Sequence, residues 1–249
     1  IGIVGVGVVG KATASILEQH ANIKKNDPAQ GYKDDISNCD IIFICINEKD
    51  CEMTFLSELI DVLVEQNKKC FFVIRTTVIP GTTDKLAKKH KRDFVFMPEF
   101  LREWRVVRDT FDPDKIVIGT EDKGIFETLS TLFSDIVYLN RIVKAKPIEA
   151  ELAKVYLNSL ALIKVVFAEE LYDLAESLGA DYDTIYRIFK YDQNVNERHL
   201  IPKKDNYRGA NGKCLPKDTD FLIKAGKEKS KMSLLETAKI LNDLFLKVK

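Results

Sequence analysis

Short apolar runs alternate with amphipathic stretches along the first half of the chain. The runs are rich in β-branched and aromatic residues, which is typical of strands buried on both faces of a parallel sheet. The stretches between them have the apolar spacing of helices. We expect strands at residues 1–4, 41–46, 71–74, 94–96, 116–118 and 136–138, and helices at residues 8–19, 55–66, 83–89 and 125–133. The pattern predicts an α/β fold with a doubly wound parallel sheet.

The pattern changes near Lys144. Apolar residues keep helical spacing from residue 148 to residue 178 without a proline, and Gly179 stands where a helix cap is expected. A helix of this length is typical of the spine of a separate helical domain. We therefore predict a first domain over residues 1–144 and a helical central domain over residues 145–249, with shorter helices at 183–190 and 234–248.

Composition narrows the class of function. The 38 basic and 38 acidic side chains cancel, so no global field attracts nucleic acid or an anionic membrane surface. No apolar stretch approaches the roughly 20 residues of a membrane span, and the chain does not open on a signal peptide. The five cysteines are odd in number and lack metal-ligand spacing, which favours reduced thiols. We expect a cytoplasmic protein that acts on a small molecule and binds no nucleic acid, membrane or metal.

Three glycines punctuate the turn between the first expected strand and the first expected helix. In a dinucleotide site of this pattern, Gly5 makes the tight turn, Gly7 lets the backbone approach a pyrophosphate, and Gly10 packs the helix closely. The helix N-terminus then faces the diphosphate. We predict a Rossmann-like domain whose cofactor loop consists of Gly5, Val6, Gly7, Val8, Val9 and Gly10.

An acidic residue is expected about 20 residues after this loop, where it binds the ribose hydroxyls of the adenosine. Asp27 follows a short apolar run at residues 21–23 and lies at a fitting distance, which favours NAD over NADP. Two alternatives remain. Asp27 could merely start a turn with Pro28, and Lys24 and Lys25 could receive a 2′-phosphate.

Three segments far apart in the sequence carry polar side chains four residues apart, about one turn of a helix, so Lys154 and Asn158 on the long helix share a face. The pairs are Glu99 and Glu103, Lys154 and Asn158, and Cys214 and Asp218. Each has a simpler explanation: the glutamates could form a solvated face, Lys154 could pair with Glu151 at the surface, and Cys214 could be a small core residue.

Cys214 has neighbours that favour a reactive thiol. It stands just before an expected helix start, with Pro216 in the first turn and Lys213 and Lys217 beside it. Positive charge and a helix N-terminus both stabilise a thiolate, so we predict a depressed pKa and a usable nucleophile.

Several ordered segments, taken together, resemble the UDP-glucose/GDP-mannose dehydrogenase family over nearly the whole chain. The segments are the glycine loop, residues 76–83, 98–103, 113–119, 150–158 and 214–218. The resemblance implies oxidation of the C6 alcohol of a nucleotide sugar to the carboxylate, through two successive hydride transfers to two NAD molecules without release of the aldehyde. Within the family, UDP-glucose is the most common substrate.

The resemblance also implies a role for each matching residue. Cys214 would capture the C6 aldehyde as a thiohemiacetal, which the second NAD oxidises to a thioester that water hydrolyses. Lys154 and Asn158 would stabilise the oxyanion, a role whose loss typically costs about 100- to 1000-fold in rate. Asp218 would help to position or activate water.

Further roles follow from the same resemblance. Glu99 would be the base of thioester hydrolysis with Thr77 holding its water, while Glu103 and Lys217 would contact NAD or order the site. The division of labour between the two glutamates stays open. Contacts with the nucleotide sugar are expected from Glu99, Phe100, Leu101, Arg102, Lys154, Asn158, Arg198 and Asn211.

Arg198 lies where the family often carries an arginine that enters the substrate site of a partner subunit. This implies a homodimer built on the long helix. The alternative is an ordinary exposed surface arginine.

The chain departs from the family in ways that bear on its substrate. The segment after Asp27 is short, Ala210 and Asn211 replace glycines before the nucleophile, and Trp104 replaces a glycine after Glu103. The family also continues into a further α/β domain that grips the nucleotide, whereas this sequence stops at residue 249. A UDP-N-acetylhexosamine or GDP-mannose therefore stays an alternative substrate, as does a fragment that binds NAD and dimerises with little activity alone.

Overall fold

Two units make up the chain in the computed structural model, which describes residues 1–48, 51–203, 207–227 and 229–248. The units are Ile1–Lys154 and Val155–Lys249. Their division falls inside one continuous helix, α6 (Pro147–Ser177). The domain boundary after residue 144 stays a prediction.

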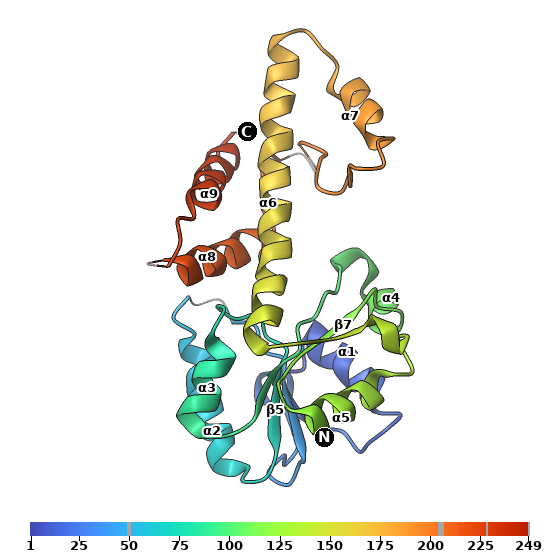
Figure 1. Cartoon of the computed structure of the whole chain (residues 1–249), viewed down its shortest axis with the longest axis vertical. Helices are drawn as coiled ribbons and strands as arrows, with labels where there is room; N and C mark the ends of the chain where they lie inside the picture. The colour runs from blue at the N-terminus through green and yellow to red at the C-terminus, as the bar shows by residue number, and fades with distance from the viewer. Residues whose placement is uncertain (49–50, 204–206, 228, 249) are drawn as a thin grey trace. The chain divides into compact units, whose positions relative to one another are not determined.

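The first unit is built on an eight-stranded sheet with the strand order β3-β2-β1-β4-β5-β6-β7-β8 (Figure 1). Neighbouring strands run parallel, except that β3 pairs antiparallel with β2 and β7 pairs antiparallel with β6. The strands are β1 (Gly2–Val4), β2 (Lys24–Asp27), β3 (Tyr32–Lys33), β4 (Ile41–Ile44), β5 (Phe71–Ile74), β6 (Phe94–Phe96), β7 (Ile116–Gly119) and β8 (Ile142–Ala145).

Helices cover both faces of this sheet. Figure 1 shows α2 and α3 on one side and α1 and α5 on the other. Leu17 of α1 and Phe133 of α5 pack with Phe43 of β4 in one buried core cluster. The helices are α1 (Val8–Leu17), α2 (Thr54–Gln66), α3 (Thr82–His90), α4 (Val106–Phe111) and α5 (Lys123–Phe133), with 3-10 turns at Pro28–Gln30, Glu103–Arg105 and Leu139–Arg141. The expected doubly wound α/β fold is confirmed.

The observed strands depart from the expected ones. The strand β2 at Lys24–Asp27 was not expected, because its residues, which make the parallel ladder with β1, are polar. The last strand is β8 at Ile142–Ala145 and not residues 136–138, where buried Val137 packs into the core from an irregular segment. At residues 136–138 an apolar run indicated burial without indicating the backbone conformation.

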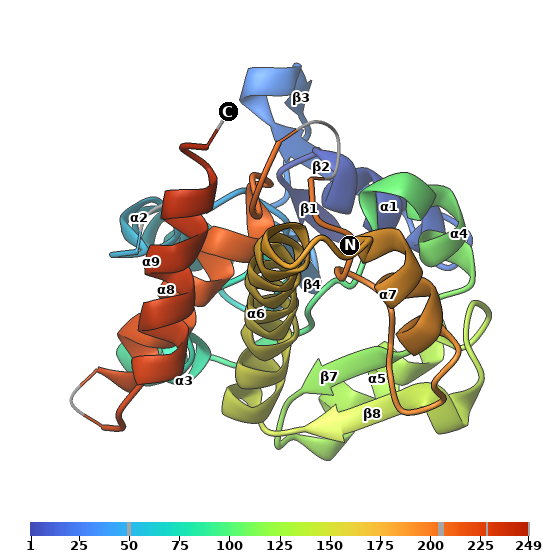
Figure 2. The same cartoon turned by 90° about the horizontal axis from the view of Figure 1, so that it is seen from above.

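The second unit is helical. Figure 2 looks along α6 and shows α8 and α9 on one side of it and α7 on the other. The expected end of α6 is confirmed, because Gly179 has a φ of +70° and the Ala180 amide donates to the Ala175 carbonyl at 2.8 Å. The further helices are α7 (Tyr182–Lys190), α8 (Cys214–Gly226) and α9 (Ser233–Phe245).

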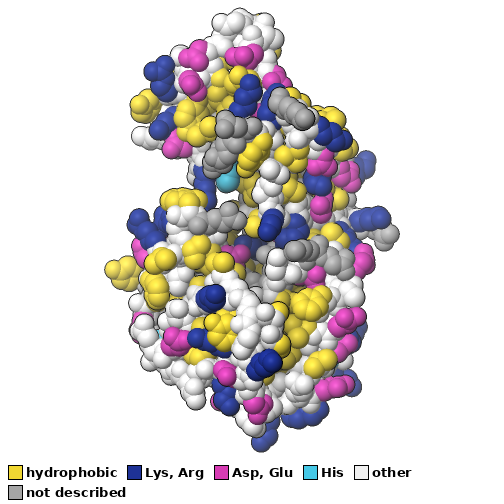
Figure 3. Space-filling model, turned by 180° about the vertical axis from the view of Figure 1, so that it is seen from behind, with side chains coloured by type: hydrophobic (Ala, Val, Ile, Leu, Met, Phe, Trp, Pro, Cys, Tyr) yellow, Lys and Arg dark blue, Asp and Glu magenta, His cyan; other side chains and the backbone are white. Residues whose placement is uncertain are grey.

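Surface charges of both signs are interspersed on the face drawn in Figure 3, in keeping with the zero formal charge of the chain. Among the described residues, no helix combines the length and the apolar character that crossing a bilayer requires.

Candidate active site

The glycine loop after β1 has the shape that a dinucleotide site needs. Gly5 has a φ of +83°, and a Cβ at Gly10 would lie 1.9 Å from the Gly5 carbonyl oxygen, so both positions require glycine. At Gly7 no atom lies within 4 Å of an added Cβ, which leaves open space beside the N-terminus of α1. No side chain caps this helix, so its first amides face the position expected for a diphosphate. The loop fits a bound dinucleotide.

Asp27 is the last residue of β2 and lies against this loop. Its Oδ2 accepts hydrogen bonds from the Val6 amide at 2.7 Å and from Gln30 Nε2 at 2.8 Å. The side chain of Lys25 forms an ion pair with Glu18, at 2.8 Å between Nζ and Oε1. A carboxylate at this strand end therefore favours the unphosphorylated ribose of NAD.

Glu99, which follows β6, pairs with Lys154 of α6. Lys154 Nζ donates to Glu99 Oε1 at 2.9 Å and to the Glu99 carbonyl oxygen at 2.7 Å. The side chain of Glu99 is 18% exposed and that of Lys154 is 9% exposed. Glu99 is therefore not part of a solvated face, and Lys154 is held in the interior of the first unit.

The surroundings of Glu99 keep it ionised. Burial raises the pKa of Glu99, but the charge and hydrogen bond of Lys154, the Leu101 amide and the charge of Arg75 together hold that pKa below its usual range. A buried carboxylate that stays an anion beside a lysine can receive a proton from water and orient polar groups of a substrate.

Arg75, which sequence reasoning missed, lies close enough to Glu99 for its charge to lower the pKa of that carboxyl. It follows β5, is 9% exposed, and its Nε has no hydrogen-bond partner among the described residues. Burial lowers the pKa of Arg75, while Cys45 and Glu99 oppose the shift. Only the fold brings this cation to Glu99, since the two residues follow the neighbouring strands β5 and β6.

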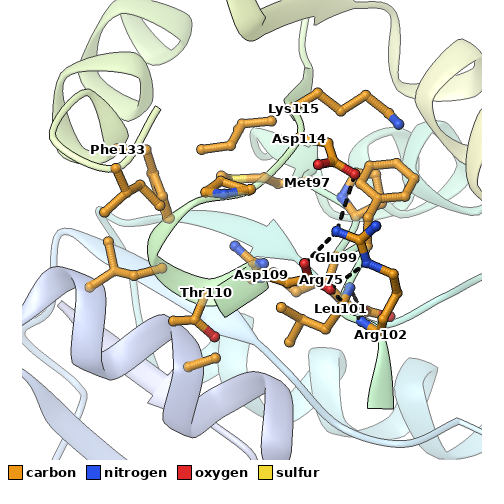
Figure 4. A pocket seen from close by; sticks show the side chains of 17 residues that line it. Arg75, Met97, Glu99, Leu101, Arg102, Asp109, Thr110, Asp114, Lys115 and Phe133 are labelled. Carbon is orange, nitrogen blue, oxygen red and sulfur yellow. Dashed lines mark hydrogen bonds and ion pairs between the residues drawn. The ribbon is translucent and has the colours of Figure 1, made fainter. Parts of the chain in front are cut away.

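A cavity of about 60 Å³ opens beside these residues, which is room for a few water molecules. Figure 4 shows Arg75, Glu99 and Arg102 along its lining. Arg102 Nε donates to Asp109 Oδ2 at 2.7 Å, and its Nη2 lies 3.2 Å from Asp114 Oδ2. The guanidinium of Arg102 thus fixes the loop that follows Glu99. Substrate contacts by Phe100, Leu101 and Arg102 stay predictions.

Glu151, one turn before Lys154, anchors the segment that carries Thr77. Its carboxylate accepts hydrogen bonds from the Gly81 amide at 2.5 Å and from the amide and hydroxyl of Thr83 at 2.8 and 2.6 Å. Glu151 therefore caps α3 and does not lie at the surface with Lys154. Burial raises the pKa of Glu151, although these donors oppose the shift. Thr77, half-buried in the loop before α3, keeps its role as a prediction.

Glu103 belongs to the 3-10 turn Glu103–Arg105. Its side chain lies outside the part of the chain that the structure describes, so its contact with NAD stays a prediction.

The helix α8 begins at Cys214, one residue earlier than the sequence indicated, and Pro216 stands in the first turn as expected. Cys214 is exposed, whereas Cys45 and Cys70 are buried. Burial raises the pKa of Cys45 to about 11, against the effect of Arg75, so that thiol is inert at neutral pH. The explanation of Cys214 as a core residue is therefore excluded.

Asp218, one turn into α8, is 1% exposed and joins two other residues of the second unit. Asn158 Nδ2 donates to its Oδ2 at 2.6 Å, and Lys217 Nζ lies 2.7 Å from its Oδ1. Lys217 also lies 4.3 Å from the centre of the Phe221 ring. This cluster places Asn158, Lys217 and Asp218 around the first turns of the helix that Cys214 begins. The contact of Lys217 with NAD stays a prediction.

Arg198 and Asn211 are both exposed in the second unit. The Arg198 amide donates to Asn196 Oδ1 at 3.0 Å. Burial lowers the pKa of Lys164, and the charge of Arg198 adds to that shift. Their contacts with a nucleotide sugar stay predictions.

Two models of one family match the chain. The NAD binding domain of the UDP-glucose/GDP-mannose dehydrogenase family matches residues 15–137, and the central domain of that family matches residues 148–244. The dinucleotide of the first unit is thus NAD, in agreement with the position of Asp27.

Curated relatives support the same match. A UDP-glucose 6-dehydrogenase of Rickettsia conorii is 30% identical over 198 residues, which are 75% of this chain and 45% of the relative. One of Streptococcus pneumoniae is 30% identical over 220 residues, 83% of this chain and 54% of the relative. The chain spans about half the length of the curated relatives it matches.

Solved structures share the fold. A UDP-glucose dehydrogenase of Pyrobaculum islandicum superposes with a TM-score of 0.80 at 22% identity, over 98% of this chain and 67% of its own. A UDP-D-ManNAc dehydrogenase of Pyrococcus horikoshii has a TM-score of 0.82 at 19% identity, over 98% of this chain and 69% of its own.

Proposed function

Because this chain belongs to the UDP-glucose/GDP-mannose dehydrogenase family, we propose that it carries out the NAD-dependent oxidation of a nucleotide-sugar C6 alcohol to the carboxylate, with UDP-glucose as substrate. The observation that carries this proposal is the placement of Cys214. It is exposed at the first position of α8, one turn before the buried Asp218 that holds Asn158 and Lys217.

The chemistry assigns one step to each group. NAD, when bound, would accept a hydride from C6, while the hydroxyl proton of that alcohol passes to water. The Cys214 thiolate forms a C–S bond to the aldehyde carbon, and the carbonyl oxygen becomes an oxyanion that Lys154 and Asn158 stabilise. After the second hydride has left, water attacks the thioester carbon, the C–S bond breaks, and Cys214 leaves as the thiolate.

Glu99 takes the proton of the attacking water, with Thr77 orienting that water. Its lowered pKa keeps it in the basic form at neutral pH, with Lys154 as its counterion at 2.9 Å. Asp218 keeps Asn158 and Lys217 oriented through its two oxygens.

An apolar stripe along α6 supports a homodimer. Tyr156, Leu160, Phe167 and Leu174 are 56%, 40%, 58% and 53% exposed, and their spacing places them on one face of the helix. Such a face is typical of a helix that packs against a second copy. A cytoplasmic location belongs to the same proposal, since the chemistry needs a reduced Cys214.

The test is an NADH assay of the full chain over UDP-glucose, UDP-N-acetylglucosamine and GDP-mannose, with the acid measured in parallel. We expect two NADH for each acid, and the highest kcat/KM with UDP-glucose. Preference for another sugar would correct the substrate alone. NAD binding without turnover of any sugar would favour a dinucleotide-binding and dimerisation module.

A further inference from the structure

A buried ion pair lies in the second unit, apart from the residues assigned above. Glu169 of α6 accepts a hydrogen bond from Arg208 Nε at its Oε2, at 2.8 Å. The side chains are 2% and 10% exposed. Arg208 lies in the segment that leads directly to Cys214.

Glu169 holds the backbone around Arg208 as well as its side chain. The second carboxylate oxygen accepts hydrogen bonds from the Gly209 amide at 3.0 Å and the Lys203 amide at 3.2 Å. The Glu169 carbonyl oxygen accepts another from Arg208 Nη2 at 3.1 Å. One residue of α6 therefore fixes both the side chain and the main chain of this segment.

Asn242 of α9 fixes the next peptide from the other side. It is fully buried, its Oδ1 accepts from the Ala210 amide at 2.7 Å, and its Nδ2 lies 3.4 Å from the Ala210 carbonyl oxygen. Gly209 has a φ of +74°, and a Cβ there would lie 3.0 Å from Asn242 Oδ1. A side chain at position 209 would therefore fit only if Asn242 shifted by a few tenths of an ångström.

The ion pair is a costly way to gain stability alone. Removing two charges from water costs several kcal/mol per ion, and well-packed apolar residues often serve as well. Burial lowers the pKa of Arg208, but Asp173 and Glu169 raise it above its usual value, so Arg208 stays charged. What such a pair supplies is a single geometry, because each charge is stable only against its partner.

We propose that Glu169, Arg208 and Asn242, here called the clamp, are positioning residues that hold residues 208–210 so that Cys214 stays at the N-terminus of α8. Cys214 is already exposed, so the clamp does not control access to it. It controls where the sulfur sits relative to the helix amides that stabilise a thiolate. Its catalytic consequence rests on the proposed function, whereas its effect on the thiol does not.

The test compares Glu169→Gln and Gly209→Ala with wild type and with Asp173→Asn. Glu169→Gln removes the charge at constant size, and Gly209→Ala moves the backbone at constant charge. Asp173→Asn is the matched control, because Asp173 contacts Arg208 at 2.8 Å with a side chain that is 51% exposed, and no backbone contact of the clamp depends on it.

Two readouts separate positioning from stability. The first is the rate of iodoacetamide alkylation at Cys214 at pH 7, resolved by peptide mass spectrometry without substrate or NAD. The second is kcat and KM for acid formation. We expect both clamp variants to alkylate at least threefold more slowly, and kcat to fall about 10- to 100-fold, as for a displacement of about 1 Å, at unchanged KM for NAD. Asp173→Asn should match wild type in both.

Wild-type alkylation rates in both clamp variants would overturn the proposal, even if their unfolding midpoints fall. If one variant fails to fold, the other decides, since they act through charge and backbone separately. Slowed alkylation in a protein that oxidises no nucleotide sugar would support the clamp and reject the proposed function. Slowed alkylation with unchanged kcat would reject the catalytic consequence of the clamp.

Discussion

Glu99 owes its ionisation to a lysine that is distant in sequence and 2.9 Å away in the fold. Glu151, one turn before that lysine, is a buried carboxylate with the opposite shift, because burial outweighs its three hydrogen bonds. Two glutamates, one paired with a lysine of α6 and one on α6 itself, thus have different proton affinities. Burial and partner, not residue identity, determine them.

These opposite shifts predict opposite pH dependences of stability. The lowered pKa of Glu99 means that its contribution is complete above the ordinary glutamate value of about 4.3 and is lost as pH falls through the lower folded value. The raised pKa of Glu151 means that its ionisation costs stability as pH rises from about 4.3 through the higher folded value.

Urea unfolding of wild type, Glu99→Gln and Glu151→Gln between about pH 3.5 and 7 measures both effects. The stability advantage of wild type over Glu99→Gln should grow with pH, and its advantage over Glu151→Gln should shrink. Equal pH slopes for the two variants would contradict the assigned directions.

Cys214→Ser tests the nucleophile by itself. A hydroxyl has no thiolate to form the C–S bond, so acid formation should fall by at least about 1000-fold, the scale of losing an activated nucleophile. NAD affinity should stay unchanged, because the glycine loop belongs to the first unit. Cys39→Ser, at a half-buried cysteine, is the control, and acid formation by Cys214→Ser at the wild-type rate would reject covalent catalysis.

At the scale of elements, α6 contributes groups to several local structures. Its first turns carry Glu151 to the start of α3 and Lys154 to the loop after β6. Further along, Asn158 reaches Asp218 of α8 and Glu169 reaches Arg208. These polar contacts lie on some faces of α6, and the apolar stripe lies on another.

That stripe predicts a dimer that a single charge should break. Phe167→Glu would place a carboxylate in the apolar contact, and burying it unpaired costs several kcal/mol. Sedimentation velocity should show a dimer for wild type and a monomer for the variant. Glu176→Lys, an exposed position on the opposite face of α6, should stay dimeric. A monomeric wild type would reject the dimer.

At the scale of the whole molecule, NAD should stabilise the chain by mass action. At a concentration 100 times the dissociation constant, one bound ligand adds about 2.7 kcal/mol to the free energy of unfolding. Thermal unfolding should therefore shift upward with NAD and less with an equal concentration of NADP, whose 2′-phosphate would meet the Asp27 carboxylate. Asp27→Ala should narrow the difference between the cofactors, and equal shifts for both in wild type would contradict the role of Asp27.

Local sequence patterns by themselves determined the α/β class and the long helix. The strands β5 and β6 lie where the apolar runs predicted them, and the helix start at Cys214 lies within one residue of its prediction. The period of apolar residues, a glycine at positive φ and a proline in a first turn are all properties of a few neighbouring residues. They can be recognised without the rest of the chain.

The tertiary structure alone decided which of these groups meet and what state they adopt. It formed β2 from polar residues and brought the charge of Arg75 close to Glu99. It also paired Glu151 with the first turn of α3 and Glu169 with Arg208. None of these contacts follows from spacing, because each joins residues from separate elements. Their energies depend on burial and on the partner's charge, and both exist only once the chain has packed.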